Sequence, residues 1–490
     1  MEPEYQWVTP SGNAANDTST GRLHTDVPGR PTARRSLAGV RFGRRSGLTA
    51  LGVITAITLL LVLDATAGPS ILVPRSGFIY PGWEAGPLDH LIPQVLANRY
   101  GLQDAVSAAL GVLFLAWLVV IGALDSLSRR TIWTVVIALH VILLLGPPSQ
   151  LTDMFNYLGY ARLGALHDLN PYIHPISSES WDPVFLLSSW HDLRSPYGEL
   201  FTIISYPLGL LSLSAAYWIV KIVTVALSLC FLWLIERCAL RLNVDPRRAV
   251  GYVALNPIFI LYAVGGFHND FFMLVPMMGA LLLVLTGRER AAGACLMAAI
   301  AVKFTAGLLG PFLLVALPDW PRRRRLVEGG LIMLLPILAA SLILFGTSLP
   351  NLSQQSTLLT NFSGPNLVGL IFGVGGAPTL LHIATLLVVV VIIYQLARRR
   401  ERWLEGTGWS TVALIISLSW VVPWYVVWML PFAVLGRSRG LRLASVLLTV
   451  WLLFTFAPST TQFMNDHNLS LLTITRAGRA SLALQHRLAF

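Results

Sequence analysis

The sequence predicts an all-α, polytopic integral membrane protein, a bundle of about 11 to 13 transmembrane helices. Hydrophobic residues make up 55% of the 490 residues and charged residues only 12%, whereas a soluble domain carries about 25% charged residues. The apolar residues also form blocks close to the ~20 residues that cross a bilayer as a helix. A soluble fold has no interior large enough for this much apolar sequence.

The apolar blocks predict the membrane crossings in chain order. They lie near residues 48–66, 105–124, 131–148, 214–235, 249–265, 270–286, 291–302, 304–318, 326–345, 377–396, 408–423, 424–436 and 441–457. Several blocks are shorter than ~20 residues, above all 291–302 and 304–318, and we expect these to be tilted or re-entrant and packed against protein. The apolar stretch 200–213 is expected to be a helix on the membrane surface.

The chain divides into three regions. Residues 1–45 are rich in Gly, Ser, Thr, Pro and Arg without periodicity, which predicts a disordered cytoplasmic tail. This tail is too long and polar for a cleaved signal peptide, so the first helix is expected to stay as an anchor. Residues 46–457 form the membrane domain, and residues 458–490 are a C-terminal tail expected on the extracytoplasmic side.

The net charge of +11 comes from arginines that cluster in short connectors between the apolar blocks. The positive-inside rule places these connectors in the cytoplasm, which predicts a multi-pass plasma-membrane protein with a cytoplasmic N-terminus. A nucleic-acid binder would instead carry a basic stripe on a folded domain, so we expect no nucleic-acid partner. The three cysteines, Cys230, Cys238 and Cys295, have no metal-ligand spacing and predict neither a disulfide framework nor a zinc site.

The polar residues that could carry chemistry lie in the opposite connectors. The connector 149–213 is long, and long loops in compact proteins are usually functional. Asp153 opens it, followed by the stripe Phe155, Tyr157, Tyr160 and Leu163, which we expect to lie flat on the bilayer. An acid there would meet a lipid-linked group and an aqueous substrate. The alternative is an N-cap of the surface helix.

Two further signals stand at the same predicted face. His268, Asn269 and Asp270 form a short turn between apolar segments, where polar groups are costly unless they are paired or used. The alternative is a turn that caps the next helix. Lys303 is one of only two lysines and could bind an anionic head group or phosphate, or simply snorkel to the interface. The other, Lys221, is expected to snorkel.

Three weaker candidates complete the set. Arg194 is one of few arginines in the outer connectors and could clamp a phosphate or pair with Asp192. Trp424 and Tyr425 lie at an outer boundary, where an aromatic belt would also explain them. The preceding proline indicates a helix break that faces a cavity.

Together these motifs resemble the polyprenol-phosphate-sugar-dependent glycosyltransferases of the GT-C fold, in particular actinobacterial mannosyltransferases that extend the mannan of lipomannan and lipoarabinomannan. The resemblance covers residues 48–457 and rests on short motifs in a shared order. They are Thr152-Asp153-Met154-Phe155-Asn156-Tyr157, Asn170-Pro171-Tyr172, Ser195-Pro196-Tyr197-Gly198, His268-Asn269-Asp270, Val302-Lys303 and Pro423-Trp424-Tyr425.

The resemblance implies a GT-C-like bundle with the site formed by extracytoplasmic loops, and an inverting transfer in cell-envelope glycan synthesis. A sugar moves from a polyprenyl phosphate to a hydroxyl of a glycolipid or polysaccharide. Mannose is the sugar expected from the resemblance, although arabinose and glucose donors share the polyprenyl phosphate. Asp153 matches the general base, and one base suffices because the phosphate is already a competent leaving group. Lys303, His268 and Arg194 would neutralise that phosphate, with Asn269, Asp270, Tyr197, Trp424 and Tyr425 as further substrate-binding residues.

Three points stay open at this stage. Many relatives carry the acid directly after the first helix, which makes Asp64 a rival base. Metal dependence differs within the fold class, and the sequence assigns no metal ligand or cofactor. A transporter or flippase of a lipid-linked sugar is an alternative function, which predicts internal repeats and ionisable groups at mid-membrane. A non-catalytic membrane scaffold would leave the His-Asn-Asp turn and Lys303 unexplained.

Overall fold

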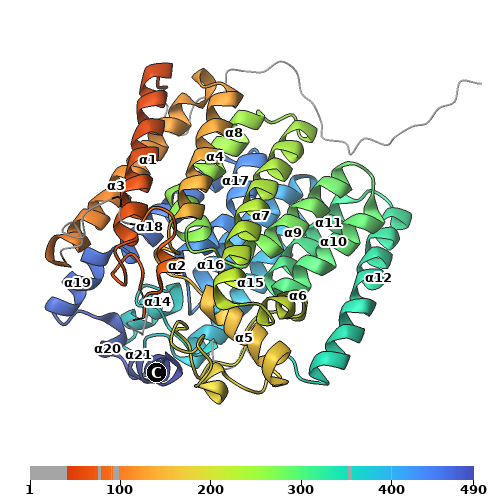
Figure 1. Ribbon diagram of the computed structural model, residues 1–490. Helices are drawn as coiled ribbons and strands as arrows, with labels where there is room; N and C mark the ends of the chain where they lie inside the picture. Colours follow the sequence, from red (N-terminus) through yellow and green to blue (C-terminus); the bar gives the residue numbers. More distant parts are fainter. Residues whose placement is uncertain are drawn as a thin grey trace, which may run out of the picture.

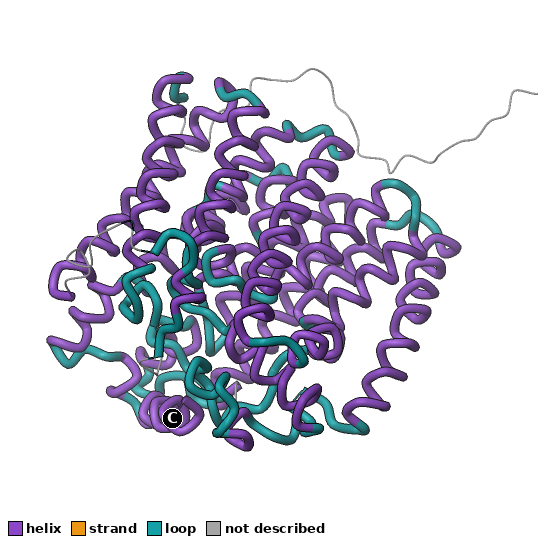
Figure 2. Tube along the Cα trace, viewed as in Figure 1, coloured by secondary structure: helices purple, strands orange, loops and turns teal. Residues whose placement is uncertain are grey.

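The computed structural model describes residues 41–74, 79–89, 91, 99–350, 356–398 and 400–489. In these ranges the chain is helical and contains no strand (Figures 1 and 2). The all-α prediction is therefore confirmed. The predicted tail lies outside the described residues as far as residue 40, and the first helix begins at Arg44, slightly before the predicted crossing.

Within the described ranges, five helices are long and apolar enough to cross a membrane. They are α1 (Arg44–Ala65), α3 (Arg99–Ala123), α7 (Leu213–Arg241), α12 (Trp320–Phe345) and α15 (Pro378–Arg398). The bent pair formed by α18 (Arg439–Thr455) and the helices after it could add a sixth. On α12 and α15 large apolar side chains such as Ile343 and Leu386 are exposed, as expected for helices that face lipid. The protein is thus a multi-pass membrane protein.

The remaining predicted crossings are shorter or broken. They form α4 (Arg129–Leu145), α8 (Pro246–Ala254) followed by the π-helix η4 (Phe259–Val264), α9 (Asp270–Leu285), α10 (Glu289–Val302), η5 (Phe304–Leu308) with α11 (Leu309–Ala316), α16 (Trp403–Ser417), and η7 (Pro423–Trp428) with α17 (Leu430–Leu435). The break before η4 follows from Asn256, whose side-chain oxygen accepts the N–H groups of Ile258 and Phe259. The break after α10 falls at Lys303, which is extended (φ −153°). Two of these breaks lie beside the polar cluster described below.

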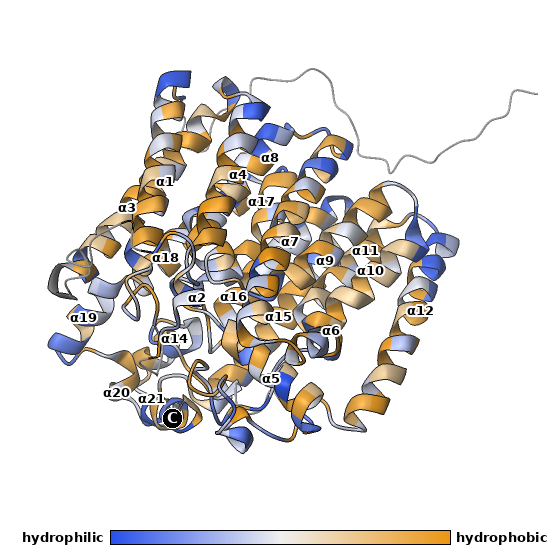
Figure 3. Cartoon of the chain, viewed as in Figure 1, coloured by the Kyte–Doolittle hydropathy of each residue, from blue (hydrophilic) through white to orange (hydrophobic). Residues whose placement is uncertain are grey.

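The arginine-rich connectors gather at one end of the bundle. Ion pairs tie neighbouring connectors together: Arg129–Glu236, Arg248–Asp125, Arg290–Glu328 and Arg325–Glu289. Figure 3 shows the hydrophilic ends of α1, α4 and α12 on this side. Helix α9 ends, and α10 begins, at one of these connectors. Asp270 at the start of α9 and Lys303 after the end of α10 therefore both lie at the other end of the bundle.

Short helices and loops cover that opposite end (Figures 1 and 2). They include α2 (Gly82–Ala85), α5 (Met154–His167), η3 (Ile176–Glu179), α6 (Glu199–Gly209) and α14 (Gly364–Ile371). The predicted surface helix forms as α5, but its aromatic stripe does not face the bilayer. Phe155, Tyr157, Tyr160 and Leu163 are all buried, packed against protein rather than lipid. The surface helix predicted at 200–213 corresponds to α6.

The C-terminal residues fold back onto the same end. They form α19 (Pro458–Asp466), α20 (Leu471–Ile474) and α21 (Arg476–Ala489). The carbonyl of Leu488 accepts the backbone N–H of Asp192 at 3.0 Å. Leu488, Leu193 and Leu358 form a small buried apolar cluster. The region predicted as a tail is therefore helical and packs against the connector 149–213.

Candidate active site

The candidate site forms where the connector 146–153 packs against the turn 265–269. The carbonyl of Gly266 accepts a hydrogen bond from the Thr152 hydroxyl at 2.8 Å, and the carbonyl of Gly265 accepts the N–H of Ser149 at 2.9 Å. A Cβ at Gly266 would lie 2.5 Å from the Leu151 carbonyl oxygen, so only glycine permits this approach. The two polar motifs, far apart in sequence, are thus brought side by side.

Asp153 stands at the N-cap position of α5 without capping it, because its side chain accepts no backbone N–H there. The capping alternative is therefore not supported by the structure. The side chain is 28% exposed, and its Oδ2 lies 3.9 Å from Nδ1 of His268. Burial raises the pKa of Asp153 to about 6, against the opposing charge of Lys303 and a hydrogen bond from Tyr197. Asp153 is thus a carboxylate that can titrate near neutral pH.

His268 is completely buried and stacks on Trp424, with ring centroids 3.5 Å apart. Its Nε2 lies 3.0 Å from the Leu151 carbonyl oxygen. Since a carbonyl can only accept, Nε2 carries the proton and the unprotonated Nδ1 faces Asp153. Burial lowers the pKa of His268 to about 3, so the ring is neutral at physiological pH.

Asp270 and Lys303 form a buried ion pair. Nζ of Lys303 lies 2.9 Å from Oδ1 of Asp270, and the indole N–H of Trp428 donates to the same oxygen at 2.5 Å. Asp270 is 2% exposed, whereas the Lys303 side chain is 19% exposed and lies 5.4 Å from the ring centre of Tyr425. Lys303 is therefore fixed by a carboxylate and does not simply snorkel, and Asp270 does not cap α9.

Tyr197 reaches the cluster because its loop packs on the end of α10. The N–H of Gly198 donates to the Val302 carbonyl at 3.2 Å. A Cβ at Gly198 would lie 2.2 Å from the Ala301 carbonyl oxygen, so this close approach requires glycine. The Tyr197 ring contacts the ring of Tyr157 edge to face, with centroids 4.9 Å apart. The loop thereby places the Tyr197 hydroxyl beside Asp153.

The other candidates are placed differently. Asn269 is buried behind the site, and its backbone N–H donates to the Tyr157 hydroxyl at 3.1 Å. Arg194 is exposed, and within the described part of the chain it forms no ion pair with Asp192, which accepts the Ser177 hydroxyl instead. None of the contacts described joins Asp64 to the cluster. The expectation that Lys221 snorkels is wrong, because its side chain is completely buried.

Two residues of the cluster were missed by sequence reasoning. Trp428 fixes Asp270, and Tyr157 accepts the N–H of Asn269. Trp428 lies four positions after Trp424, and that helical spacing within an aromatic run was the available signal. Tyr157 was hidden in a stripe read as membrane-facing.

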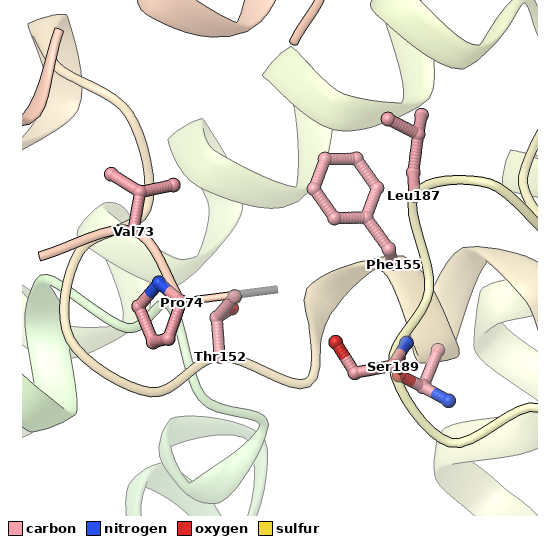
Figure 4. Close-up of a pocket in the computed structure, with 7 residues that line it drawn as sticks. Val73, Pro74, Thr152, Phe155, Leu187 and Ser189 are labelled. Atoms are coloured by element: carbon pink, nitrogen blue, oxygen red, sulfur yellow. Dashed lines mark hydrogen bonds between the residues drawn. The ribbon is translucent and has the colours of Figure 1, made fainter. Parts of the chain in front are cut away.

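Two recesses flank the cluster. One, of about 250 Å³, lies on the other side of the first turn of α5 and is lined by Thr152, Phe155 and Ser189 among others (Figure 4). A second, of about 310 Å³, lies between α9, η5 and α16 and shares Trp428 with the cluster. Met273, Met277, Leu309 and Phe432 make its lining mostly apolar. Among the described residues no group of three or more His, Cys, Asp or Glu side chains could hold a metal ion.

Comparison with known proteins agrees with this architecture. Residues 77–319 match the family described as "Alpha-(1->6)-mannopyranosyltransferase, N-terminal domain", and residues 367–485 match the "MptB C-terminal domain". Alpha-(1->6)-mannopyranosyltransferase A of Mycobacterium tuberculosis is 27% identical over 71% of this chain and 74% of its own length. The Corynebacterium glutamicum protein of the same name is 27% identical over 38% of each chain.

A second alpha-(1->6)-mannopyranosyltransferase of Mycobacterium tuberculosis is 31% identical over 30% of this chain and 26% of its own length. No solved structure is significantly similar to this chain. The two family matches together span most of the membrane bundle and include Asp153, His268, Asp270, Lys303 and Tyr425. The chain therefore belongs to the alpha-(1->6)-mannopyranosyltransferase family and is a membrane glycosyltransferase.

Proposed function

We propose that this protein transfers mannose from a polyprenyl phosphate to a hydroxyl of a glycolipid or polysaccharide outside the cytoplasm, with inversion at the anomeric carbon. The observation that carries the proposal is the unequal environment of the two carboxylates. Asp153 is partly exposed, whereas Asp270 is buried and bound to Lys303 and Trp428. Only Asp153 is available to a substrate.

Asp153 has the properties of a general base. Its pKa of about 6 leaves most of the carboxylate ionised at neutral pH and still basic enough to accept a proton in the transition state. The unprotonated Nδ1 of His268 faces it at 3.9 Å, so a neutral acceptor rather than a second charge lies beside the carboxyl group. With one available carboxylate, direct attack by the acceptor hydroxyl is favoured over a glycosyl-enzyme intermediate.

Lys303 is suited to the phosphate. One N–H of its ammonium group is directed at Asp270, and within the described part of the chain no other hydrogen-bond acceptor is assigned to it, which leaves the remaining donors for a ligand. As the bond to the sugar breaks, negative charge grows on the phosphate, and a fixed cation stabilises it without reorganisation. Tyr425, stacked on Trp428 at 4.1 Å, lies under the ammonium and limits its movement.

The apolar recess supports a lipid-linked donor. It begins at Trp428, whose indole N–H contacts Asp270, and continues along Met273 and Met277 of α9. Thr305, two residues after Lys303, also lines it. A phosphate at Lys303 would therefore lie close to an apolar surface that an isoprenoid chain can contact.

The direct test is transfer from labelled polyprenyl phosphate mannose to a mannose oligomer by membranes that contain the protein. Asp153→Ala is expected to lose transfer at unchanged protein level, and unchanged transfer would refute the base assignment. Movement of the labelled lipid across vesicles without glycosidic bond formation would indicate a flippase instead.

Sidedness has its own test. Ser180 lies in the connector 149–213 and Arg324 in the arginine-rich start of α12, and both are exposed. Single cysteines at these positions, in a background without the native cysteines, should react with a membrane-impermeant reagent from opposite faces. Reaction of Ser180→Cys from the cytoplasmic face would refute the proposed extracytoplasmic site.

A further inference from the structure

Lys221 is a buried cation outside the cluster formed by Asp153, His268, Asp270 and Lys303. It lies near the start of α7 and has 0% exposed surface. An ionisable group inside a membrane bundle is costly, so its presence there points to a function. A methionine would fill a similar volume without that cost.

Lys221 contacts both segments that form the site. Its Nζ donates to the carbonyl of Gly146 at 2.5 Å. The same atom lies 5.1 Å from the ring centre of Phe267 and 4.2 Å from that of Trp218. Gly146 ends α4 and opens the connector to Asp153, and Phe267 immediately precedes His268.

Both contacted positions are conformationally constrained. Phe267 has φ of 51°, which a bulky residue adopts only when its surroundings enforce it. A Cβ at Gly146 would lie 2.2 Å from Val62 of α1, so this carbonyl is held close to two helices. A cation at the carbonyl end of α4 also satisfies a terminal acceptor and matches the helix dipole.

The other surroundings hold Lys221 in place. The Tyr217 hydroxyl, one turn earlier on α7, donates to the backbone carbonyl of Glu84 at 2.8 Å and lies 3.5 Å from Nζ. Glu84 itself is completely buried in α2, and its charge acts on Lys221. Helix α2 thus covers Lys221, which explains why the ammonium cannot reach the membrane interface.

We propose that Lys221 is a positioning residue, which holds the connector that carries Asp153 and the turn that carries His268 in the relative placement needed for transfer. This inference rests on the proposed function, because it takes Asp153 as the base. Lys221 acts through the Gly146 carbonyl and the Phe267 ring and does not touch the reacting atoms.

The first test compares Lys221→Met with Ser228→Ala, a control two turns further along α7. Ser228 is equally buried, and its hydroxyl bonds only within its own helix, to the Val225 carbonyl. Lys221→Met is expected to lower kcat by about 10- to 100-fold, the loss that a small misplacement of a reacting group causes. KM for the polyprenyl phosphate donor is expected to change by less than about threefold, since donor contacts remain. The control should retain wild-type kcat.

The second test places Lys221→Met in the Asp153→Asn background. If Lys221 acts by positioning the Asp153 carboxylate, then its loss should matter little once that carboxylate has been removed. The double variant should therefore transfer at nearly the rate of Asp153→Asn alone. Independent, multiplied losses would overturn the inference, as would wild-type kcat in Lys221→Met. If Asp153→Asn itself retained full transfer, the proposed base would be refuted instead.

A second substitution covers the case that Lys221→Met does not accumulate. Lys221→Gln is neutral but keeps an N–H donor within reach of the Gly146 carbonyl, so it should fold more readily and keep more activity than the methionine variant. The same double-variant comparison then applies to Lys221→Gln. A loss in kcat that persists unchanged in the Asp153→Asn background would again overturn the inference.

Discussion

Lys303 and Asp270 are neighbours with opposite effects on the proposed base. The charge of Lys303 lowers the pKa of Asp153, and the charge of Asp270 raises it. A general base must be ionised, so the transfer rate should rise with pH through a pKa of about 6 in the wild type. Lys303→Met removes the cation and should move this rise to higher pH. Asp270→Asn removes the like charge and should move it to lower pH.

The expected size follows from the position of Lys303 in the cluster. A nearby opposite charge changes a carboxyl pKa by ~1–3, and the partial exposure of Asp153 favours the lower end. With a change of about one pH unit, the ionised fraction at pH 6 falls from about one half to about one tenth. At pH 6 the wild type should show about one half of its own high-pH activity, and Lys303→Met about one tenth of its own. The ratio of activity at pH 6 to activity at high pH should therefore be roughly fivefold lower in Lys303→Met.

The measurement is kcat/KM for mannosyl transfer between pH 5 and 9, fitted for the position of the acidic limb rather than for absolute rate. Absolute rate is the weaker readout because Lys303→Met is also expected to weaken binding of the donor phosphate. Arg129→Met is the matched control, since it removes a cation from the opposite end of the bundle, where Arg129 pairs with Glu236. If the acidic limb of the pH profile moved in the same direction in Lys303→Met and Asp270→Asn, the opposite charge effects assigned to these two residues would be refuted.

Three further outcomes are expected. Asp153→Asn should lower transfer by about 10²- to 10⁴-fold yet raise the melting temperature at pH 7, because burial raises the pKa of this carboxyl and ionisation therefore opposes folding; a lower melting temperature would contradict this. His268 has its pKa lowered from 6.5 to about 3, so its neutral form stabilises the fold above pH 6.5 and that contribution is lost as pH falls toward 3. The acid sensitivity should shrink in His268→Phe, as followed by thermal unfolding. Gly198→Ala would place a Cβ 2.2 Å from the Ala301 carbonyl oxygen and should lower kcat about tenfold or more without altering any reacting group; wild-type kcat would show that the loop need not approach α10.

The sequence was sufficient to predict the helical class and the gathering of arginines, because both depend on composition averaged over many residues. It could not place the breaks within the spans. Asn256 ends α8 through its own side-chain hydrogen bonds, and Lys303 ends α10 in an extended conformation. Such local events scarcely change the hydropathy of a segment, so continuous crossings were predicted there.

The sequence also could not predict which side chains are buried against protein rather than exposed to lipid. A stripe of apolar residues has the same spacing whether it faces lipid or protein, which is why α5 was expected on the bilayer surface. Lys221 was misjudged for a related reason, since snorkelling depends on what covers the helix, and its cover, α2, comes from a connector far away in sequence. For the candidate site, polar residues at helix ends were visible one by one. The pairing of Lys303 with Asp270 was not, because nothing in a single sequence couples two positions on different helices.

The C-terminal fold-back has a consequence for how the enzyme matures. The connector that carries Tyr197 is held from outside by Leu488, whose carbonyl accepts the Asp192 N–H and whose side chain packs with Leu193. During synthesis the connector is made long before Leu488. The loop around Asp153 therefore lacks this support until α21 has been translated, so a chain truncated before α21 should show lower transferase activity.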